Sequence, residues 1–202
     1  MSSKKINNQN ISSYERQSTE IISTFWIVQH TLYLKAGSSL YEIDLQTKKK
    51  TEIIKNMAND NLSYVDGKIF YINNKYLLEI YFVDTQTSTE INTHHVSACY
   101  ALEQQVLIQT MDGEMIVYSL DDSSTKKLCE TTGTLKNADE NYFYCLSDEK
   151  IIDKYSVSDG RKCDTIYMDY NVVEIKSSTD GKNIYIATHN GTDTVYQCYT
   201  NE

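Results

Sequence analysis

The sequence predicts an all-β fold made of about five repeated units, and two observations carry the prediction. A short pattern of an apolar residue, a tyrosine, any residue and a second apolar residue recurs four times, with a fifth, weaker copy. Each copy follows another run of strand-forming residues, and turn-forming residues separate most of these pairs. Four strands per unit at a regular spacing are typical of the blades of a small β-propeller, with about five four-stranded blades here.

The tyrosines of the pattern set the size of the unit. They stand at Tyr41, Tyr81, Tyr118, Tyr155 and Tyr196, so the intervals are 40, 37, 37 and 41 residues, with a mean near 39. The copy at Tyr155 is weaker because Lys154 replaces its first apolar residue. At this period a chain of 202 residues holds five blades and is too short for a complete ring of seven.

The strands of each unit can be assigned in order. The second strands are the β-rich runs before each tyrosine motif: 32–34, 69–72, 106–108, 142–145 and 184–186. Asp112-Gly113 and Asn190-Gly191 are the clearest hairpin turns, because these residues tolerate positive φ. A first strand precedes each pair, and a fourth follows most of them, as at 51–54. The central strands are apolar on both faces, as in 68–72, which suits sheets that are stacked on both sides.

The ends of the chain decide how the last blade is completed. The final copy leaves only 199–202 behind it, so the fifth blade has no fourth strand of its own. Residues 25–29 suit the first strand of the first blade. We expect 19–23, or nearby residues, to supply the missing strand and close the ring, because closure removes an exposed sheet edge. Residues 1–18 are then a polar segment and 19–202 a single domain. The alternative is an open ring, or part of a larger propeller, in which a partner adds the strand.

The unit resembles a degenerate WD40-type repeat. Residues 179–188 are similar to that family's turn into its second strand, and 111–120 to the turn and third strand, with Tyr118-Ser119 in place of Trp-Asp. Segments 43–47 and 83–87 keep the Asp and the following Thr. The sequence has no Trp-Asp and no Gly-His pair, and its first copy matches a quinoprotein-like blade about equally well. The resemblance covers about residues 20–202, implies a propeller, and permits completion of a blade by a partner's strand, as in coat and nuclear-pore propellers.

Net charge and cysteine content indicate the compartment and the classes of partner to expect. The formal net charge of −9 argues against a broad electrostatic grip on nucleic acid or anionic lipid. No apolar run approaches the ~20 residues that span a bilayer, and residues 1–17 lack the apolar core of a secretory signal. The five cysteines are widely spaced without a CxxC pair, which indicates reduced thiols. We therefore expect a cytoplasmic or nuclear protein.

No catalytic motif stands out. The sequence has no P-loop, Rossmann fingerprint, G-x-S-x-G elbow or EF-hand loop. His94, His95 and Cys99 are the densest group of potential metal ligands, but no second cluster stands at zinc-site spacing, so we interpret them as a turn before a strand. Adjacent carboxylates at 121–122, 139–140 and 148–149 are interpreted as turn residues. The only acids near the expected inner strands are Asp60, Glu103, Asp139 and Glu174.

The candidate interaction residues are an aromatic side chain and three basic clusters. They are Trp26 (with Tyr14 as a second aromatic), Lys48, Lys49, Lys50, Lys126, Lys127, Arg161 and Lys162. Each aromatic could equally be a core residue. The clusters fall after the third strands and would lie along one rim, either as a solvated edge or as a contact to RNA or an acidic protein. We predict a non-catalytic scaffold that binds other protein subunits of a multi-protein or ribonucleoprotein assembly, without membrane insertion, metal or cofactor. The alternatives are direct RNA contact and a five-bladed propeller hydrolase.

Overall fold

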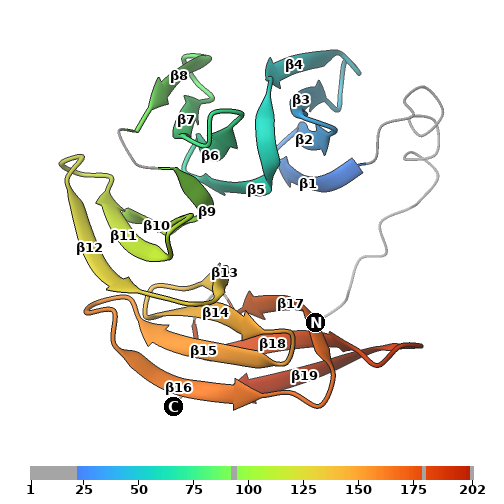
Figure 1. Ribbon diagram of the computed structural model, residues 1–202. Coiled ribbons are helices and arrows are strands. Elements are labelled where there is room, and N and C mark those ends of the chain that lie inside the picture. The colour runs from blue at the N-terminus through green and yellow to red at the C-terminus, as the bar shows by residue number, and fades with distance from the viewer. Residues whose placement is uncertain (1–21, 92–94, 179–180, 201–202) are drawn as a thin grey trace. The chain divides into compact units, whose positions relative to one another are not determined.

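The computed structural model describes residues 22–91, 95–178 and 181–200, and the regular elements in these ranges are all β-strands. The nineteen strands form five antiparallel sheets (Figure 1). No helix occurs in the described ranges, so they contain none that could cross a membrane. The predicted all-β class is confirmed.

Within every sheet, each strand pairs with the next one along the chain. The first sheet consists of β1 (Ile22–Val28), β2 (Thr31–Ala36), β3 (Ser39–Asp44) and β4 (Lys50–Ile54). The second consists of β5 (Met57–Val65), β6 (Lys68–Asn73), β7 (Leu78–Phe82) and β8 (Thr87–Glu90). The third consists of β9 (Val96–Ala101), β10 (Gln105–Thr110), β11 (Glu114–Ser119) and β12 (Thr125–Glu130). The fourth consists of β13 (Thr134–Ala138), β14 (Tyr142–Asp148), β15 (Ile151–Ser156) and β16 (Lys162–Tyr167). The fifth consists of β17 (Asn171–Ser177), β18 (Asn183–His189) and β19 (Thr194–Thr200).

The chain divides into two compact units, which we describe separately: residues 1–56 with the first sheet, and 57–202 with the other four. In the second unit the sheets pack face to face in chain order. We call the face that packs against the preceding sheet the near face, and the face that packs against the following sheet the far face. The inner strands β5, β9, β13 and β17 contact one another in series.

Three apolar clusters hold these four sheets together. Phe70 and Leu78 on the far face of the second sheet pack with Cys99 and Val106 of the third. The next two joints repeat this arrangement with other residues: Leu107 and Met115 pack with Leu135 and Phe143, and Tyr144 and Ile152 pack with Ile175 and Ile184. The central strands are therefore buried on both faces, as their sequences predict.

Polar side chains of one inner strand also bind the backbone of the next. The Oδ1 atom of Asn61 accepts a hydrogen bond from the amide of Cys99 (2.6 Å), and Ser63 Oγ accepts one from the amide of Ala101 (3.1 Å). Both pairs are 38 residues apart, so the sequence period is also the period of the contacts. These bonds satisfy donors along an inner edge that would otherwise be unpaired.

The structural register of the repeat agrees with the sequence register in the middle of the chain and departs from it at both ends. Tyr81, Tyr118 and Tyr155 pair with the second residue of the preceding strand in their sheets. In the first sheet that position belongs to Ile43, which pairs with Leu32. In the fifth sheet, alignment of the β17–β18 turn with the others gives Ile184 and its partner Tyr199. The structural counterparts are thus Ile43 and Tyr199 in place of Tyr41 and Tyr196.

The last sheet has three strands among the described residues, as the sequence predicts for the fifth blade. The predicted closing strand falls mostly outside them, because residues 19–21 are not described, whereas Ile22 and Ser23 begin β1. Closure by an N-terminal strand therefore stays a prediction. The expected first strand at 25–29 is confirmed as β1, which pairs with β2.

Candidate interaction surfaces

The first basic cluster lies at the hairpin between β3 and β4. Asp44 shapes this turn, since its carboxylate accepts hydrogen bonds from the amides of Thr47 (2.8 Å) and Gln46 (2.7 Å). These backbone bonds hold the pKa of Asp44 below its usual value. Lys48, at the end of the turn, has a positive φ of 63° and is exposed, as is Lys49.

Lys50 begins β4 and is engaged with an aromatic ring. Its Nζ atom lies 3.7 Å from the ring centroid of Tyr41, which is a cation–π contact. The strand register places both side chains on the same face of the sheet as Leu32 and Leu34. Lys50 therefore belongs to a surface that also carries apolar residues.

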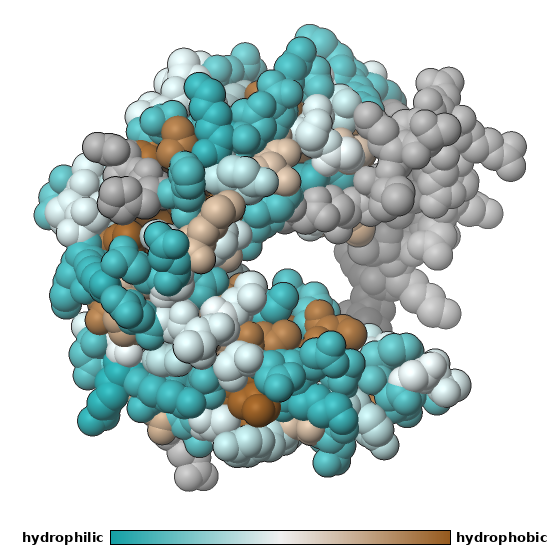
Figure 2. Space-filling view, viewed as in Figure 1, coloured by the Kyte–Doolittle hydropathy of each residue, from teal (hydrophilic) through white to brown (hydrophobic). Residues whose placement is uncertain are grey.

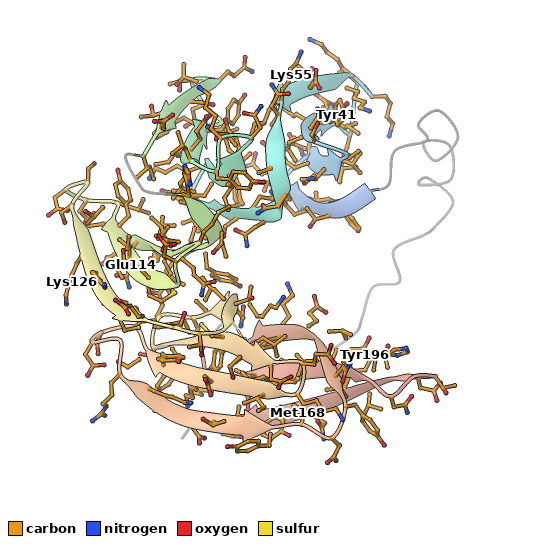
Figure 3. The ribbon with its side chains drawn as sticks, in the orientation of Figure 1. Tyr41, Lys55, Glu114, Lys126, Met168 and Tyr196 are labelled. Carbon is orange, nitrogen blue, oxygen red and sulfur yellow. The ribbon has the colours of Figure 1, made fainter. Side chains whose placement is uncertain are left out.

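The second cluster lies on β12, the outer strand of the third sheet (Figure 3). Lys127 is held between two carboxylates, with its Nζ atom 2.7 Å from Glu114 and 2.8 Å from Glu130. The hydrogen bonds that Lys127 donates to these two carboxylates raise its pKa. Lys126 points to the other side of the strand and lines a shallow pocket.

The third cluster lies at the hairpin between β15 and β16. Asp159 shapes this turn by accepting a hydrogen bond from the amide of Arg161 (3.1 Å), and that bond lowers the pKa of Asp159. Lys162 lies 2.7 Å from Asp153, which is 5% exposed. Burial acts to raise the pKa of Asp153, but hydrogen bonds from Lys162 and Thr165 hold it below its usual value.

The shallow pocket lies between the third and fourth sheets and has a volume of about 220 Å³. Val117, Leu128 and Val157 supply its apolar wall, and Lys126 and Glu140 its charged rim. Gly160 packs closely on Leu128: a Cβ atom at this residue would lie 2.8 Å from the carbonyl oxygen of Leu128. The pocket is small and open, and it marks the place where the outer parts of two neighbouring sheets meet.

The acids considered for chemistry serve mainly in turns. Asp139 is 9% exposed, and its Oδ1 atom accepts the amides of Asn141 and Tyr142, both at 2.9 Å. Asp122 accepts the amide of Ser124 (3.0 Å), and hydrogen bonds from Ser124 lower the pKa of Asp122 to about 2. Glu174 lies 3.5 Å from Lys176 on the same strand.

The histidine–cysteine group is divided in the structure. Cys99 is 1% exposed, and burial raises its pKa to about 12. His95 is exposed, and His94 lies outside the described residues. Within the described ranges no three His, Cys, Asp or Glu side chains are grouped so as to hold a metal ion.

The two candidate aromatic anchors are Trp26 and Tyr14. Trp26 is half-buried in β1 and stacks on Tyr33, with ring centroids 5.2 Å apart and planes inclined by 15°. Tyr14 lies outside the described residues. Trp26 and Tyr33 thus lie together on one face of the first sheet.

The far face of the last sheet is an aromatic surface that the sequence patterns did not single out. It contains Tyr185 on β18 and its cross-strand neighbours Cys198 and Tyr196 on β19. Tyr185 is 48% exposed and Tyr196 is 74% exposed. Tyr196 is labelled in Figure 3. Val173, at a bulge in β17, is 59% exposed, and hydrophobic surface is visible in the region of this strand in Figure 2.

The repeat shows why this face is unusual. By strand register, Tyr196 occupies the position of Leu78, Met115 and Ile152 in the three preceding sheets. Those three side chains are completely buried under the following sheet. The signal was present in the sequence, because the position is three residues before the repeated tyrosine, but it emerges only when Tyr199 is taken as that tyrosine.

The face of the first sheet that carries Leu32 and Leu34, which we call its near face by strand register, is also apolar. Phe25 is 62% exposed and Ile27 is 54% exposed. They pair with Leu34 and Leu32, which are half-buried. The residues at the position of Phe25 in the third, fourth and fifth sheets are Cys99, Leu135 and Ile175, and they are 1–4% exposed. We refer to the near face of the first sheet and the far face of the last sheet as the two terminal faces.

Solved structures show the same arrangement of sheets. The chain is similar to U3-55K (TM-score 0.66, 10% identity, 85% of this chain and 59% of that one). It is also similar to Hsv2 from Kluyveromyces lactis (TM-score 0.60, 11% identity, 90% and 60%) and to the N-terminal domain of Nup159 (TM-score 0.56, 11% identity, 88% and 61%). The fold is a WD40-like β-propeller. The resemblance to that repeat is therefore confirmed at the level of fold.

At identities of 10–11%, the similarity to these structures shows the fold alone. The chain spans 59–61% of the length of the three solved chains. No protein-family model matches the sequence, and no curated protein does.

Proposed function

We propose that this WD40-like propeller is a non-catalytic scaffold that binds other proteins as a subunit of a larger assembly, with the far face of its last sheet as a docking surface. One observation carries the proposal: Tyr196 is 74% exposed at a position that is completely buried in the three preceding sheets. An exposed aromatic patch of this kind is typical of an interface, because Tyr supplies a large apolar area with few rotatable bonds.

The partner that fits this surface is an apolar β-sheet face. The far faces of the second, third and fourth sheets are each covered by a near face rich in aliphatic residues, such as Ile175, Ile184 and Ile186 on the last sheet. A protein that presents such a face would bury Tyr185 and Tyr196 in the same way as Tyr144 and Ile152 are buried. The free edge of β19, which has no neighbour among the described strands, would lie beside it.

The basic clusters favour this role over direct contact with RNA. Lys127 and Lys162 are neutralised by carboxylates of their own sheets, and Lys50 lies over Tyr41. Residues 57–200 contain eleven basic and twenty-two acidic residues, a formal charge of −11. A strongly negative surface repels a polyanion. The proposal is non-catalytic because the acids near the inner strands, such as Asp139, are engaged in turn hydrogen bonds.

The test is the size of the complex in the native source. A tagged chain is purified gently from that source, beside a Tyr196→Glu variant and a Tyr167→Glu control. Tyr167 is also 74% exposed, but it lies on β16 and outside the terminal faces. We expect a stoichiometric assembly with the parent and the control, and its loss with Tyr196→Glu. A solitary monomer, or an assembly unchanged in Tyr196→Glu, would contradict the proposal.

A further inference from the structure

We propose that Asn190 is a site of spontaneous chemical modification, where the local turn promotes conversion of the asparagine to aspartate and isoaspartate by way of a succinimide. The residue lies in the exposed hairpin turn between β18 and β19. It is the only asparagine in the sequence that is followed by glycine. The inference goes beyond the proposed scaffold function and does not rest on it.

The reaction takes place within one dipeptide. The backbone nitrogen of Gly191 loses its proton to base and bonds to Cγ of Asn190, the Cγ–Nδ2 bond breaks, and Nδ2 takes up a proton and leaves as ammonia. Water then opens the cyclic succinimide. Addition of water to Cγ gives aspartate, and addition to the backbone carbonyl carbon of Asn190 gives isoaspartate. The net change consumes one water and releases one ammonia, so the solvent is the only co-reactant.

Two backbone amides hold the side-chain carbonyl of Asn190. Its Oδ1 atom accepts hydrogen bonds from the amides of Asp193 (2.7 Å) and Thr192 (2.9 Å). Because both donors lie further along the chain, these bonds fold the side chain back over the Asn190–Gly191 peptide and bring Cγ towards the nitrogen that attacks it. Negative charge develops on Oδ1 in the tetrahedral intermediate, and the same two donors stabilise it as an oxyanion hole does.

The attacking nitrogen and the leaving group are both unengaged. The Gly191 amide and Nδ2 of Asn190 donate no hydrogen bond to any residue that the structure describes. Gly191 has a φ of +96°, and nothing lies within 4 Å of its Cβ position, so neither a side chain nor a neighbour obstructs the attack. Residues 190–193 are exposed, so water has access to the succinimide.

Asn171 is an exposed asparagine that lacks these features. The amide that follows it, from Val172, donates a hydrogen bond to the carbonyl oxygen of Glu149 (2.7 Å). Nδ2 of Asn171 donates to the carboxylate of Glu149 (2.8 Å). Its nucleophile and its leaving group are therefore both engaged, and the branched side chain of Val172 crowds the attacking nitrogen. We expect Asn190 to react and Asn171 to persist.

Both products change the end of the last hairpin. Aspartate keeps an oxygen that can accept the same two amide hydrogen bonds, and it adds a negative charge beside Asp193. Isoaspartate inserts a CH2 group into the main chain, next to the last pair of the β18–β19 ladder, His189 and Thr194. Isoaspartate therefore destroys the geometry of the turn and loosens that end of the ladder.

The test is peptide mapping by mass spectrometry of the full chain during incubation near neutral pH, beside the same chain unfolded in guanidinium chloride. We expect Asn190 to gain the mass of an Asn-to-Asp conversion several-fold faster in the folded chain than in the unfolded one. Folding should instead slow the conversion of Asn171. The rate at Asn190 should rise with pH, because the attack needs the deprotonated amide nitrogen.

Matched variants separate the parts of the site. Thr192→Pro removes one of the two amides that donate to Oδ1, and Thr192→Ala keeps that amide and is the control. Gly191→Ala places a methyl group beside the attacking nitrogen. We expect Thr192→Pro and Gly191→Ala to slow the conversion of Asn190 several-fold, and Thr192→Ala to react as the parent does. Circular dichroism checks that each variant is folded, and the comparison of folded with unfolded parent chain needs no variant.

Three results would overturn the inference. One is an Asn190 that stays intact while Asn171 is converted. Another is conversion of Asn190 that is slower in the folded chain than in the unfolded one, which would mean that the turn protects the residue. The third is equal rates in folded Thr192→Pro and Thr192→Ala, which would mean that the Thr192 amide does not act on the carbonyl. The proposed scaffold function stands in all three cases.

Discussion

Tyr144 and Tyr185 occupy the same position in consecutive sheets, yet Tyr144 is completely buried and Tyr185 is 48% exposed. Each is the third residue of the second strand of its sheet, and both point to the far face. The difference comes from the next sheet along the chain: β17 to β19 cover Tyr144, whereas no described strand comes after β19. Among the described sheets, the far face of the last one therefore lacks the cover that each of the three preceding far faces receives from the next sheet.

Gly160 lies where the fourth sheet packs closely on the third. Its φ is +73°, and a Cβ atom would meet the carbonyl group of Leu128 in the neighbouring sheet at 2.8–2.9 Å. We expect Gly160→Ala to lower the free energy of unfolding by about 2–4 kcal/mol, from the positive φ and the clash together.

Gly67→Ala is the matched control for that substitution. Gly67 has a φ of +71°, but nothing lies within 4 Å of its Cβ position. This variant should lose about 1 kcal/mol, from backbone strain alone. Urea denaturation measures both values, and equal losses would contradict a close contact between Gly160 and Leu128.

Gln109 forms a buried polar link between the third and fourth sheets. Its Nε2 atom donates to Gly133 O (2.6 Å) and Thr131 Oγ1 (2.9 Å), and its Oε1 atom accepts from the amide of Leu135 (2.9 Å). Gln109→Leu leaves backbone groups unsatisfied in the interior, so we expect a loss of about 2–4 kcal/mol in urea denaturation. Gln104→Leu, at an exposed turn residue, should stay within about 0.5 kcal/mol of the parent. Similar small losses in both would show that the link is dispensable.

The turn at Asp122 should make stability depend on pH in the acid range. Hydrogen bonds from Ser124 lower the pKa of Asp122 to about 2 in the folded protein, against about 3.9 in an unfolded chain. The carboxylate therefore stabilises the fold fully above about pH 4, and this contribution disappears as the pH falls towards about 2. We expect Asp122→Ala to unfold at lower urea than the parent at pH 6, with the gap closing towards pH 2. A gap that is constant with pH would mean that the charge of Asp122 plays no part.

The cysteines should separate into two classes by reactivity. Burial raises the pKa of Cys99 and of Cys145 to about 12, so their thiolates are scarce and shielded at neutral pH. Cys163 and Cys198 are exposed. Mass spectrometry after brief alkylation of dilute protein should find label on Cys163 and Cys198, with Cys99 and Cys145 modified only in denaturant. Early labelling of Cys145 would indicate that the joint between the third and fourth sheets opens readily.

Local sequence signals were sufficient for most of the strands. The β-rich runs at 69–72 and 106–108 lie within β6 and β10, and the Asp-Gly turn at 112–113 connects β10 to β11. The signals worked there because the pattern is dictated by burial on both faces of each sheet. They worked less well at the ends, where Tyr41 and Tyr196 match the motif but Ile43 and Tyr199 hold the structural position. Hairpin lengths differ between the sheets, and pairing is set by hydrogen bonds and packing, not by the nearest tyrosine.

The sequence alone determined the strand-rich composition, the period near 39 residues and the number of sheets, because these depend on local propensity and on a pattern that each unit repeats. Only the tertiary structure decided which apolar side chains are covered. Tyr144 and Tyr185 both stand within apolar second strands, and exposure depends on whether another sheet packs on them. Likewise, Lys127 and Lys162 looked like part of a free basic rim, but carboxylates on adjacent strands neutralise them. Burial and ion pairing depend on which residues are neighbours in space, and a linear pattern does not specify those neighbours.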